Sequence, residues 1–436
     1  MAYLPNILFL VILATGVGYF TFNIKKLIRN IKLGQEIDAS DNKSERWKNL
    51  VRIALGQSKM VVRPISGLLH IVVYVGFIII NIEVLEIIID GIFGTYRIGL
   101  KVLPASLYGY LIGTFEILAI LVLVAVVAFW IRRNVIKLKR FLSAEMKGWP
   151  KNDGNIILYF EVVLMCLFLV MNATDIEFQN LNSGNVISQF IAPWFGDNLE
   201  TLHIIERSAW WLHIIGILAF LNYLYFSKHL HILLAFPNTY YGKLTPKGQF
   251  NNLASVTKEV QLMMDPNADP FAAPAEDEAD ETPAKFGASD VMDLNRIQLL
   301  NAYTCTECGR CTSVCPANLT GKKLSPRKIM MDTRDRLVEV GKNIDVNKGE
   351  FKEDGKQLLD DYITKEELWA CTTCNACVEA CPVSIDPLSI ILDMRRYLVM
   401  EKSAAPMELN NMMSNIENNG APWPYNQQDR LNWVNE

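Results

Sequence analysis

The sequence has little net charge and few histidines. Its 42 lysines and arginines nearly balance 46 aspartates and glutamates, which leaves a formal net charge of −4 over 436 residues. This balance does not suggest a nucleic-acid-binding protein, because such proteins present an excess of positive charge. No glycine-rich nucleotide fingerprint or flavin-binding loop is evident either. We therefore expect the substrate chemistry to take place on another polypeptide.

Apolar residues make up 51% of the chain and are concentrated in blocks. A helix needs about 20 apolar residues to cross a bilayer. The first block has no basic start and no clear cleavage site, so we interpret it as an anchor and not as a signal peptide. The sequence thus predicts five transmembrane helices, at Leu4–Phe22, Pro64–Ile89, Leu107–Ile131, Asn155–Met171 and Ala209–Phe226.

Lysines and arginines are concentrated after the first, third and fifth of these spans, for example in Lys25–Lys32, Arg132–Arg140 and Lys228–Lys247. The loops between are poorer in basic residues. Because basic loops tend to stay in the cytoplasm, we expect the N-terminus outside and the C-terminal part in the cytoplasm. The sequence predicts a multi-pass protein of a prokaryotic cytoplasmic membrane.

Eight of the nine cysteines fall in two short groups; the ninth, Cys166, lies alone in an apolar run as a small filler. Both groups read Cys-x-x-Cys-x-x-Cys-x-x-x-Cys-Pro, the bacterial spacing for [4Fe–4S] clusters, in which the fourth cysteine ligates the other cluster. Disulfides favour wider spacings and an oxidising compartment, and zinc sites rarely repeat this pattern. The spacing predicts one cluster on Cys305, Cys308, Cys311 and Cys381, and a second on Cys371, Cys374, Cys377 and Cys315.

Helical patterns at Lys323–Val340, Lys356–Trp369 and Leu388–Met400 lie between and after the cysteine groups. They favour an α-helical ferredoxin domain over a compact β-rich one, and so an all-α fold. We expect a membrane domain at 1–240, a linker at 241–290 that includes the acidic, Pro- and Ala-rich run Asp265–Pro283, and the ferredoxin domain at 291–400. Residues 401–436 form a turn-rich tail whose aromatic residues could dock on a partner.

His70 lies in the second span, and His213, His229 and His231 lie in or beside the fifth. Ionisable residues in lipid are costly and suggest a function, and imidazole is a usual axial ligand of haem iron. If the fifth helix continues to His231, then His213 and His231 share a face about 27 Å apart, with His229 on the opposite side. This geometry predicts at least one haem b and leaves room for a second.

His70 could pair with either His231 or His213, and a second haem would need a further ligand, for which Met60 is a weak candidate. Histidines that merely bond to backbone or lipid headgroups are the alternative. His203, near the outer end, is a surface residue or a group for quinol proton release. Four glutamates in the spans could face a quinone pocket or a proton path: Glu83, Glu86, Glu116 and Glu161. Glu83 and Glu86 lie near the outer surface, so simple hydration is the alternative for these two.

Two segments carry a resemblance to a known family. RPISGLLHIVVYVGF around His70, and WWLHIIGILAFLNYLYFSKHLHILLAFPN around His213 and His231, are similar to the haem b gamma subunit of respiratory nitrate reductase. The cysteine-rich half resembles the two-cluster subunit of heterodisulfide reductases and of related glycolate- and lactate-oxidising complexes. The chain thus resembles the membrane-bound iron–sulfur subunits related to heterodisulfide reductase.

The resemblance implies that His70 pairs with His231 at one haem and that His213 serves an outer haem. Ile80 stands where the family has its second helix-two histidine. A partner with a CCG-type domain, or a flavoprotein, is implied because this chain has no CCG motif. We predict an electron-transfer subunit that links such a cytoplasmic partner to membrane quinone through two [4Fe–4S] clusters and haem b. The alternative is a membrane-anchored iron–sulfur sensor or scaffold without haem.

Overall fold

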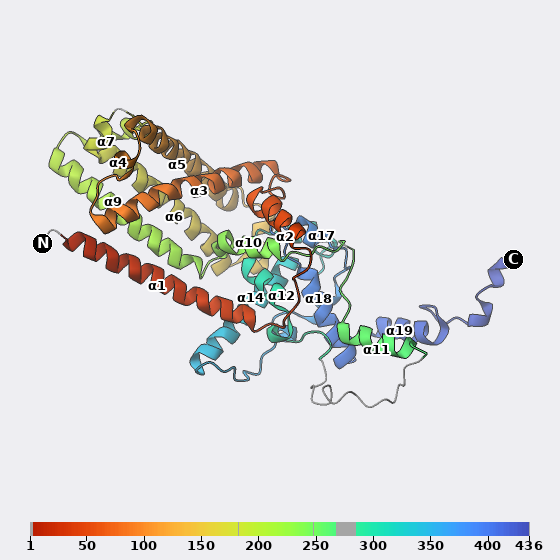
Figure 1. The fold of residues 1–436 in the computed structure, drawn as a ribbon. Helices are drawn as coiled ribbons and strands as arrows, with labels where there is room; N and C mark the ends of the chain where they lie inside the picture. The colour runs from red at the N-terminus through yellow and green to blue at the C-terminus, as the bar shows by residue number, and fades with distance from the viewer. Residues whose placement is uncertain (1–2, 182, 247, 267–284, 436) are drawn as a thin grey trace.

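The computed structural model describes residues 3–181, 183–246, 248–266 and 285–435. Within these ranges the chain forms helices joined by loops, and the β-pairing is limited to two isolated bridges. The predicted all-α fold is confirmed. The molecule has a bundle of long helices at one end and a domain of shorter helices at the other (Figure 1).

Five helices in the described residues are long and apolar enough to cross a membrane: α1 (Leu4–Lys32), α3 (Pro64–Phe93), α5 (Ala105–Asn134), α6 (Trp149–Thr174) and α9 (Leu199–Leu224). They coincide with the five predicted spans. Helices α1, α3 and α6 carry proline in their first turn, where the missing N–H has no intrahelical partner to lose. The five helices lie side by side in the bundle (Figure 1).

The bundle buries one face of each long helix and leaves the other faces apolar and exposed, as a lipid-facing surface requires. Phe115, Phe168 and Ile214 are fully buried in its core. Helices α3 and α5 approach closely at Gly76, where an added Cβ would lie 2.5 Å from Cγ2 of Val122. Small residues allow such contacts between membrane helices.

The fifth long helix does not continue to His231, so the expectation of one unbroken helix is wrong. Helix α9 ends at Leu224, and a short 3₁₀ turn, Lys228–Leu230, leads into α10 (His231–Tyr240). Ser227 is extended, with φ −116° and ψ 149°. The buried carboxylate of Asp153 on α6 accepts hydrogen bonds from the Tyr223 hydroxyl (2.6 Å) and the Lys228 backbone N–H (3.1 Å), which stabilises the break.

Shorter elements lie between the long helices along the chain or follow them. They include α2 (Lys43–Asn49), a π-helical turn (Leu50–Leu55), α4 (Gly99–Val102), α7 (Ile176–Asn180), α8 (Ser188–Ile191) and α11 (Ala254–Met264), with 3₁₀ turns at Lys139–Phe141, Ala144–Met146 and Ala192–Phe195. Most of the predicted acidic run Asp265–Pro283, from 267 to 283, lies outside the described residues.

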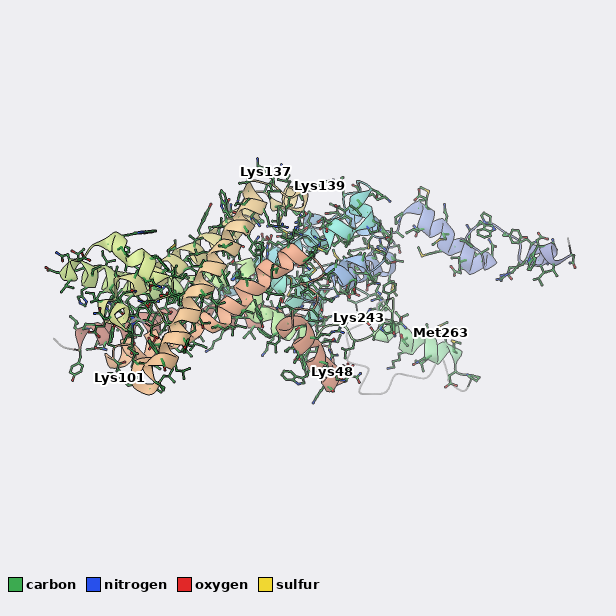
Figure 2. All side chains as sticks on the ribbon, turned by 90° about the horizontal axis from the view of Figure 1, so that it is seen from above. Lys48, Lys101, Lys137, Lys139, Lys243 and Met263 are labelled. Atoms are coloured by element: carbon green, nitrogen blue, oxygen red, sulfur yellow. The ribbon has the colours of Figure 1, made fainter. Side chains whose placement is uncertain are left out.

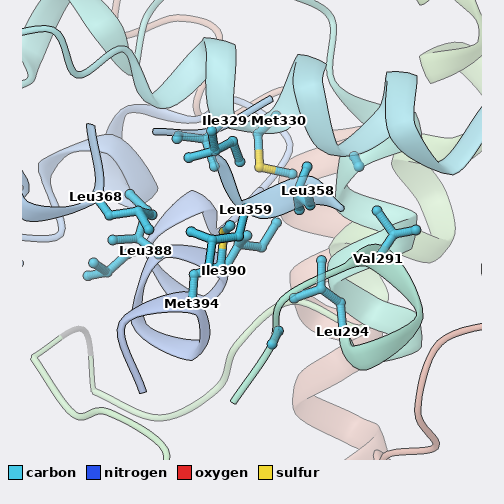
Figure 3. Packing of buried hydrophobic residues seen from close by; sticks show 14 of the residues in the cluster. Val291, Leu294, Ile329, Met330, Leu358, Leu359, Leu368, Leu388, Ile390 and Met394 are labelled. Carbon is cyan, nitrogen blue, oxygen red and sulfur yellow. The ribbon is translucent and has the colours of Figure 1, made fainter. Parts of the chain in front are cut away.

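The second domain is built from α12 (Arg296–Thr304), α13 (Pro316–Leu319), α14 (Pro326–Val346), α15 (Leu358–Asp361), α16 (Lys365–Trp369), α17 (Ala376–Ala380) and α18 (Pro387–Arg396), followed by a π-helical turn, Tyr397–Glu401. Figure 3 shows its core, in which Ile329 and Met330 of α14 pack near Leu358 and Ile390. The helix predicted over Lys356–Trp369 is instead two short ones. Asp360 within α15 has a left-handed φ of 71°, and Thr364 then caps α16.

The second domain packs on the end of the bundle opposite the N-terminus (Figure 1). Asp345 of α14 forms an ion pair with Lys26 at 2.8 Å, and Asn30 donates to the Tyr303 hydroxyl at 2.9 Å. These contacts tie α12 and α14 to the end of α1. Beyond this domain, α19 (Met407–Asn419) and the chain to 435 extend outward, with Trp423 and Trp433 exposed as predicted.

Candidate redox centres

One cavity in the second domain is lined by five cysteines. Four of them are the first three cysteines of the first motif and the last cysteine of the second motif; we call them the cluster-one cysteines: Cys305, Cys308, Cys311 and Cys381. The fifth is Cys377. The loop that carries the first three turns tightly at Gly309, which has a φ of 69°. A Cβ there would lie 2.5 Å from Nη1 of Arg327, so glycine is needed for this close approach.

The other four cysteines, Cys371, Cys374, Cys377 and Cys315, are called the cluster-two cysteines. Burial raises the pKa of the Cys371 thiol, and the negative charges of Cys315 and Cys374 raise it further, while Arg395 acts in the opposite direction. Cys315 is therefore close enough to act electrostatically on Cys371. Cys374 is exposed, whereas Cys377 and Cys315 are buried.

The thiols of both sets supply the sulfur donors that iron–sulfur clusters use. Burial raises the pKa of Cys305 to about 12 and of Cys381 to about 11. Such thiols become thiolates when a metal takes the place of the proton. The backbone N–H of Ile385 donates to Sγ of Cys381 at 3.3 Å, and that of Thr373 donates to Sγ of Cys371 at 3.4 Å. Hydrogen bonds to sulfur of this kind tune cluster potentials.

Positive charge surrounds the cluster-one cysteines on the side that faces the bundle. Arg310 lies between Cys308 and Cys311 and donates to the Lys59 carbonyl (2.9 Å) and to Sδ of Met60 (3.4 Å). The sulfur of Met60 therefore accepts a hydrogen bond from the Arg310 guanidinium. Sequence reasoning did not single out Arg310; a cation inside a cysteine motif is the signal that could have identified it.

The same loop is joined to the bundle by a buried ion-pair chain. Glu307, beside Cys308, forms ion pairs with Lys228 and with Arg334, the latter at 2.7 Å. The charges of Lys228 and Arg334 outweigh burial and lower the pKa of Glu307. Since Lys228 immediately precedes His229, this chain places the cluster-one loop next to the histidines.

The structure brings His70 and His231 together, with ring centres 6.5 Å apart. Two imidazoles on opposite sides of one metal, with bonds of about 2 Å, would have ring centres roughly 6 Å apart. Nδ1 of His231 donates to the Lys228 carbonyl at 3.1 Å, which leaves Nε2 free. A ligating histidine commonly holds its other nitrogen in this way. The distance between the two rings is therefore close to that of two imidazoles that ligate one metal.

One continuous helix would place His229 on the opposite side from His231, and the structure does not show this arrangement. Its ring centre is 5.3 Å from that of His231 and nearly perpendicular to it, and 5.5 Å from that of Phe220. The break after α9 turns both histidines to the same region. Here His229 borders the pair of His70 and His231.

His213 has a different neighbour. Its Nε2 lies 3.8 Å from Oε2 of Glu83, and both side chains are almost fully buried. No histidine ring faces His213 in the part of the chain that the structure describes; its ring neighbour is Phe168 at 6.3 Å. We expected His213 and His231 on one face of a single helix, each at the level of a haem. The structure differs, because His231 lies beyond the end of α9.

A polar cavity of about 420 Å³ opens at the end of the bundle away from the second domain; we call it the outer cavity. Glu83 and Glu86 line it, and Glu83 is only 3% exposed, so simple hydration does not describe that residue. Glu86 accepts hydrogen bonds from the Gly99 N–H (2.8 Å) and the Tyr108 hydroxyl (3.0 Å). Arg97 also lines this cavity.

The other two glutamates in the spans, Glu116 and Glu161, have different surroundings. Glu116 accepts hydrogen bonds from the backbone N–H groups of Ile187 (2.7 Å) and Ser188 (3.1 Å), so it holds a loop in place. Glu161 and His213 line a smaller apolar cavity between α3, α6 and α9. Neither glutamate lines the outer cavity.

A comparison with protein-family models matches the cysteine-rich region of the chain. A family model described as a 4Fe-4S dicluster domain matches residues 304–385, which contain both cysteine motifs. The whole chain is similar to a probable iron-sulfur-binding oxidoreductase, FadF, of Bacillus subtilis, at 29% identity over 99% of this chain and 61% of the relative. No solved structure matches.

Two further relatives extend this picture. An EtfAB:quinone oxidoreductase of Syntrophomonas wolfei is 24% identical over 98% of this chain and 59% of its own length. One chain of a dihydromethanophenazine:CoB–CoM heterodisulfide reductase of Methanosarcina mazei is 30% identical over 34% of this chain and 37% of its own length. The chain spans about three fifths of the length of the two relatives that it matches from end to end.

The fold and the cysteine-rich site define a membrane-bound, two-motif iron–sulfur protein of the electron-transfer class. The chain is similar to iron–sulfur oxidoreductases and to heterodisulfide reductase subunits. This agrees with the resemblance seen in the sequence.

Proposed function

We propose that this chain is the electron-transfer subunit of a membrane oxidoreductase complex, and that it relays electrons between a cytoplasmic redox partner and membrane quinone. Two [4Fe–4S] clusters and haem b would supply the one-electron carriers. The observation that carries the proposal is the position of the cluster-one loop, which is joined through Glu307 and Lys228 to the segment that bears His229 and His231.

The order of the sites supports a relay with two ends. Cys374 of the second set is exposed, and it offers an approach for a soluble partner. The first set lies against the bundle, where Arg310 reaches the segment before α3. A partner would therefore exchange electrons at the cluster-two cysteines, and the cluster-one cysteines would form the end of the relay nearest the membrane.

His70 and His231 would hold haem b near this inner end, and their spacing and the Lys228 carbonyl contact support the assignment. His229 borders that site as a neighbour. His213, which faces Glu83, could take part in a second haem only with a ligand of another kind. We therefore propose one haem b, with His70 and His231 as its axial ligands.

Quinone is proposed as the membrane partner because a relative similar over 98% of this chain is named as a quinone oxidoreductase. The soluble partner would be a CCG-type heterodisulfide reductase-like protein or a flavoprotein, with the exposed Trp423 and Trp433 of the tail available for docking. The basic end of the bundle would face the cytoplasm.

Spectroscopy and metal analysis of the intact purified protein test this function. We expect about eight non-haem irons per chain and the reduced absorbance bands of a b-type haem. Addition of a quinol analogue should change the redox state of that haem. Zinc in place of iron would refute the electron-transfer function, whereas iron without any haem would favour an anchored sensor or scaffold.

A further inference from the structure

A basic groove of about 470 Å³ lies between the start of α3 and the segment that follows α5. Its lining includes Arg63, Arg132, Lys139 and Arg140, and no carboxylate. It lies at the end of the bundle where the iron–sulfur domain packs. In Figure 2, Lys139 marks this end, and Lys101 lies at the opposite end of the bundle.

The cations of the groove have only neutral partners among the described residues. Arg63 donates to Oγ of Ser313 at 2.8 Å, and Arg132 donates to Oγ of Ser66 at 3.2 Å. Nε of Arg140 is buried and has no hydrogen-bond partner. Hydroxyl groups do not neutralise a guanidinium, so the positive charge of the groove is uncompensated on its lipid side.

The cations also repel one another. Arg63, Arg132, Lys139 and Arg140 line one groove, so their like charges lie close together. Among the described residues, Arg63, Arg132 and Lys139 form no ion pair, and a bound anion would relieve their repulsion.

We propose that this groove binds the phosphate headgroup of an anionic phospholipid. Guanidinium groups recognise phosphate oxygens through paired, charge-assisted hydrogen bonds. Apolar side chains continue the groove toward the bilayer: Val62 is 76% exposed and Ile65 is 64% exposed. Basic pockets at the ends of transmembrane helices are a known setting for anionic headgroups.

Position favours a lipid over free phosphate as the source of this anion. The groove opens where two membrane-spanning helices, α3 and α5, reach the end of the bundle, so acyl chains could continue along their exposed apolar faces. A bound headgroup would also contact Arg63, whose guanidinium holds Ser313 next to the cluster-one loop. The lipid would thus brace the junction between the membrane bundle and the iron–sulfur domain.

The test compares two double variants of the full chain with the same change in charge. Arg132→Gln with Lys139→Gln removes two cations from the groove. Lys137→Gln with Lys147→Gln removes two exposed cations from the same connection, outside the groove lining. Each protein is placed in nanodiscs of phosphatidylcholine with or without phosphatidylglycerol, and retained lipid is counted by native mass spectrometry after release into detergent.

We expect wild type and the outside variant to retain phosphatidylglycerol in preference to phosphatidylcholine. The groove variant should bind phosphatidylglycerol roughly 25-fold more weakly, since each of the two cations near anionic lipid contributes a factor of about five. Iron content equal to that of the outside variant would show that the groove variant is folded. Equal retention by the two variants, or no preference for phosphatidylglycerol, would overturn the proposal.

Inorganic phosphate separates the two sources of the anion. Phosphate in millimolar excess should not displace phosphatidylglycerol from wild type, because it lacks the acyl chains that contact Val62 and Ile65. Displacement as effective as that by a short-chain phosphatidylglycerol would assign the groove to free phosphate and refute the lipid. These readouts do not depend on haem or on electron transfer, so they stand apart from the test of the proposed function.

Discussion

The rings of His70 and His231 lie 6.5 Å apart, centre to centre, although one is near the start of α3 and the other begins α10. Only the break after α9 makes this meeting possible, because a continuous helix would carry His231 farther along the axis of the bundle. Two imidazoles so placed, with one anchored by a carbonyl, are the basis of our proposal of a haem between them.

His70→Ala and His231→Ala should each abolish the reduced b-type absorbance of the purified protein. Loss of one axial imidazole removes the bond that fixes the iron, whereas the exposed His203 contacts neither residue. His203→Ala is therefore the matched control and should keep the full absorbance. Haem content by the pyridine haemochrome assay measures the effect. A wild-type haem content in both ligand variants would contradict the pairing.

Crossed ligation of the clusters predicts that Cys381→Ala resembles Cys308→Ala and not Cys374→Ala. Cys381 is the last cysteine of the second motif but lines the cavity of the first. Cys381→Ala and Cys308→Ala should lose the electron paramagnetic resonance signal of the same cluster and about four of eight irons. If Cys381→Ala instead matched Cys374→Ala, each motif would hold its own cluster.

Arg310→Gln should lower the reduction potential of the membrane-side cluster by roughly 50 mV, because a nearby positive charge favours the reduced, more negative form. Arg395, which donates to the carbonyl of Leu368 and acts on Cys371, is the matched residue for the other cluster. Arg395→Gln should shift the second cluster instead. A redox titration followed by paramagnetic resonance distinguishes the two, and a shift of the same cluster in both variants would refute the assignment.

Asp332 on α14 makes the stability of the iron–sulfur domain depend on pH. Burial raises the pKa of its carboxyl to about 6, despite the ion pair with Lys328 at 2.7 Å. The pKa of Asp332 is higher in the folded state than in the unfolded state. At a pH between these two pKa values, folding is therefore accompanied by the uptake of a proton. The contribution of Asp332 is therefore favourable at low pH, and it is lost as the pH rises through about 6.

Asp332→Asn should be more stable than wild type at pH 7.5 by roughly 1–3 kcal/mol, because the amide avoids burying a charge. At pH 5.5 the wild-type carboxyl is mostly protonated, and the difference should shrink. Thermal unfolding of both proteins at the two pH values measures this. Parallel pH profiles would show that Asp332 ionises normally in the folded protein.

Much of this protein follows from sequence periodicity. Long apolar runs predict the five membrane helices, because lipid leaves no other partner for the backbone. The cysteine motifs predict their cofactor class from spacing alone, since three thiolates within one loop are positioned by local geometry. Arg310 was not identified, because its contacts with Lys59 and Met60 are far away in the sequence.

The sequence by itself determined the number of spans, the all-α class and the iron–sulfur motifs, because each is a local property of chain composition and spacing. Tertiary structure decided that His213 faces Glu83, and it decided which histidine meets His70, a pairing that residue spacing left open and only the family resemblance implied. The reason is the hydrogen bonding of Asp153, a buried carboxylate on α6, to the segment after α9. That long-range contact supports the break in the helix, and no periodicity within the fifth span could reveal it.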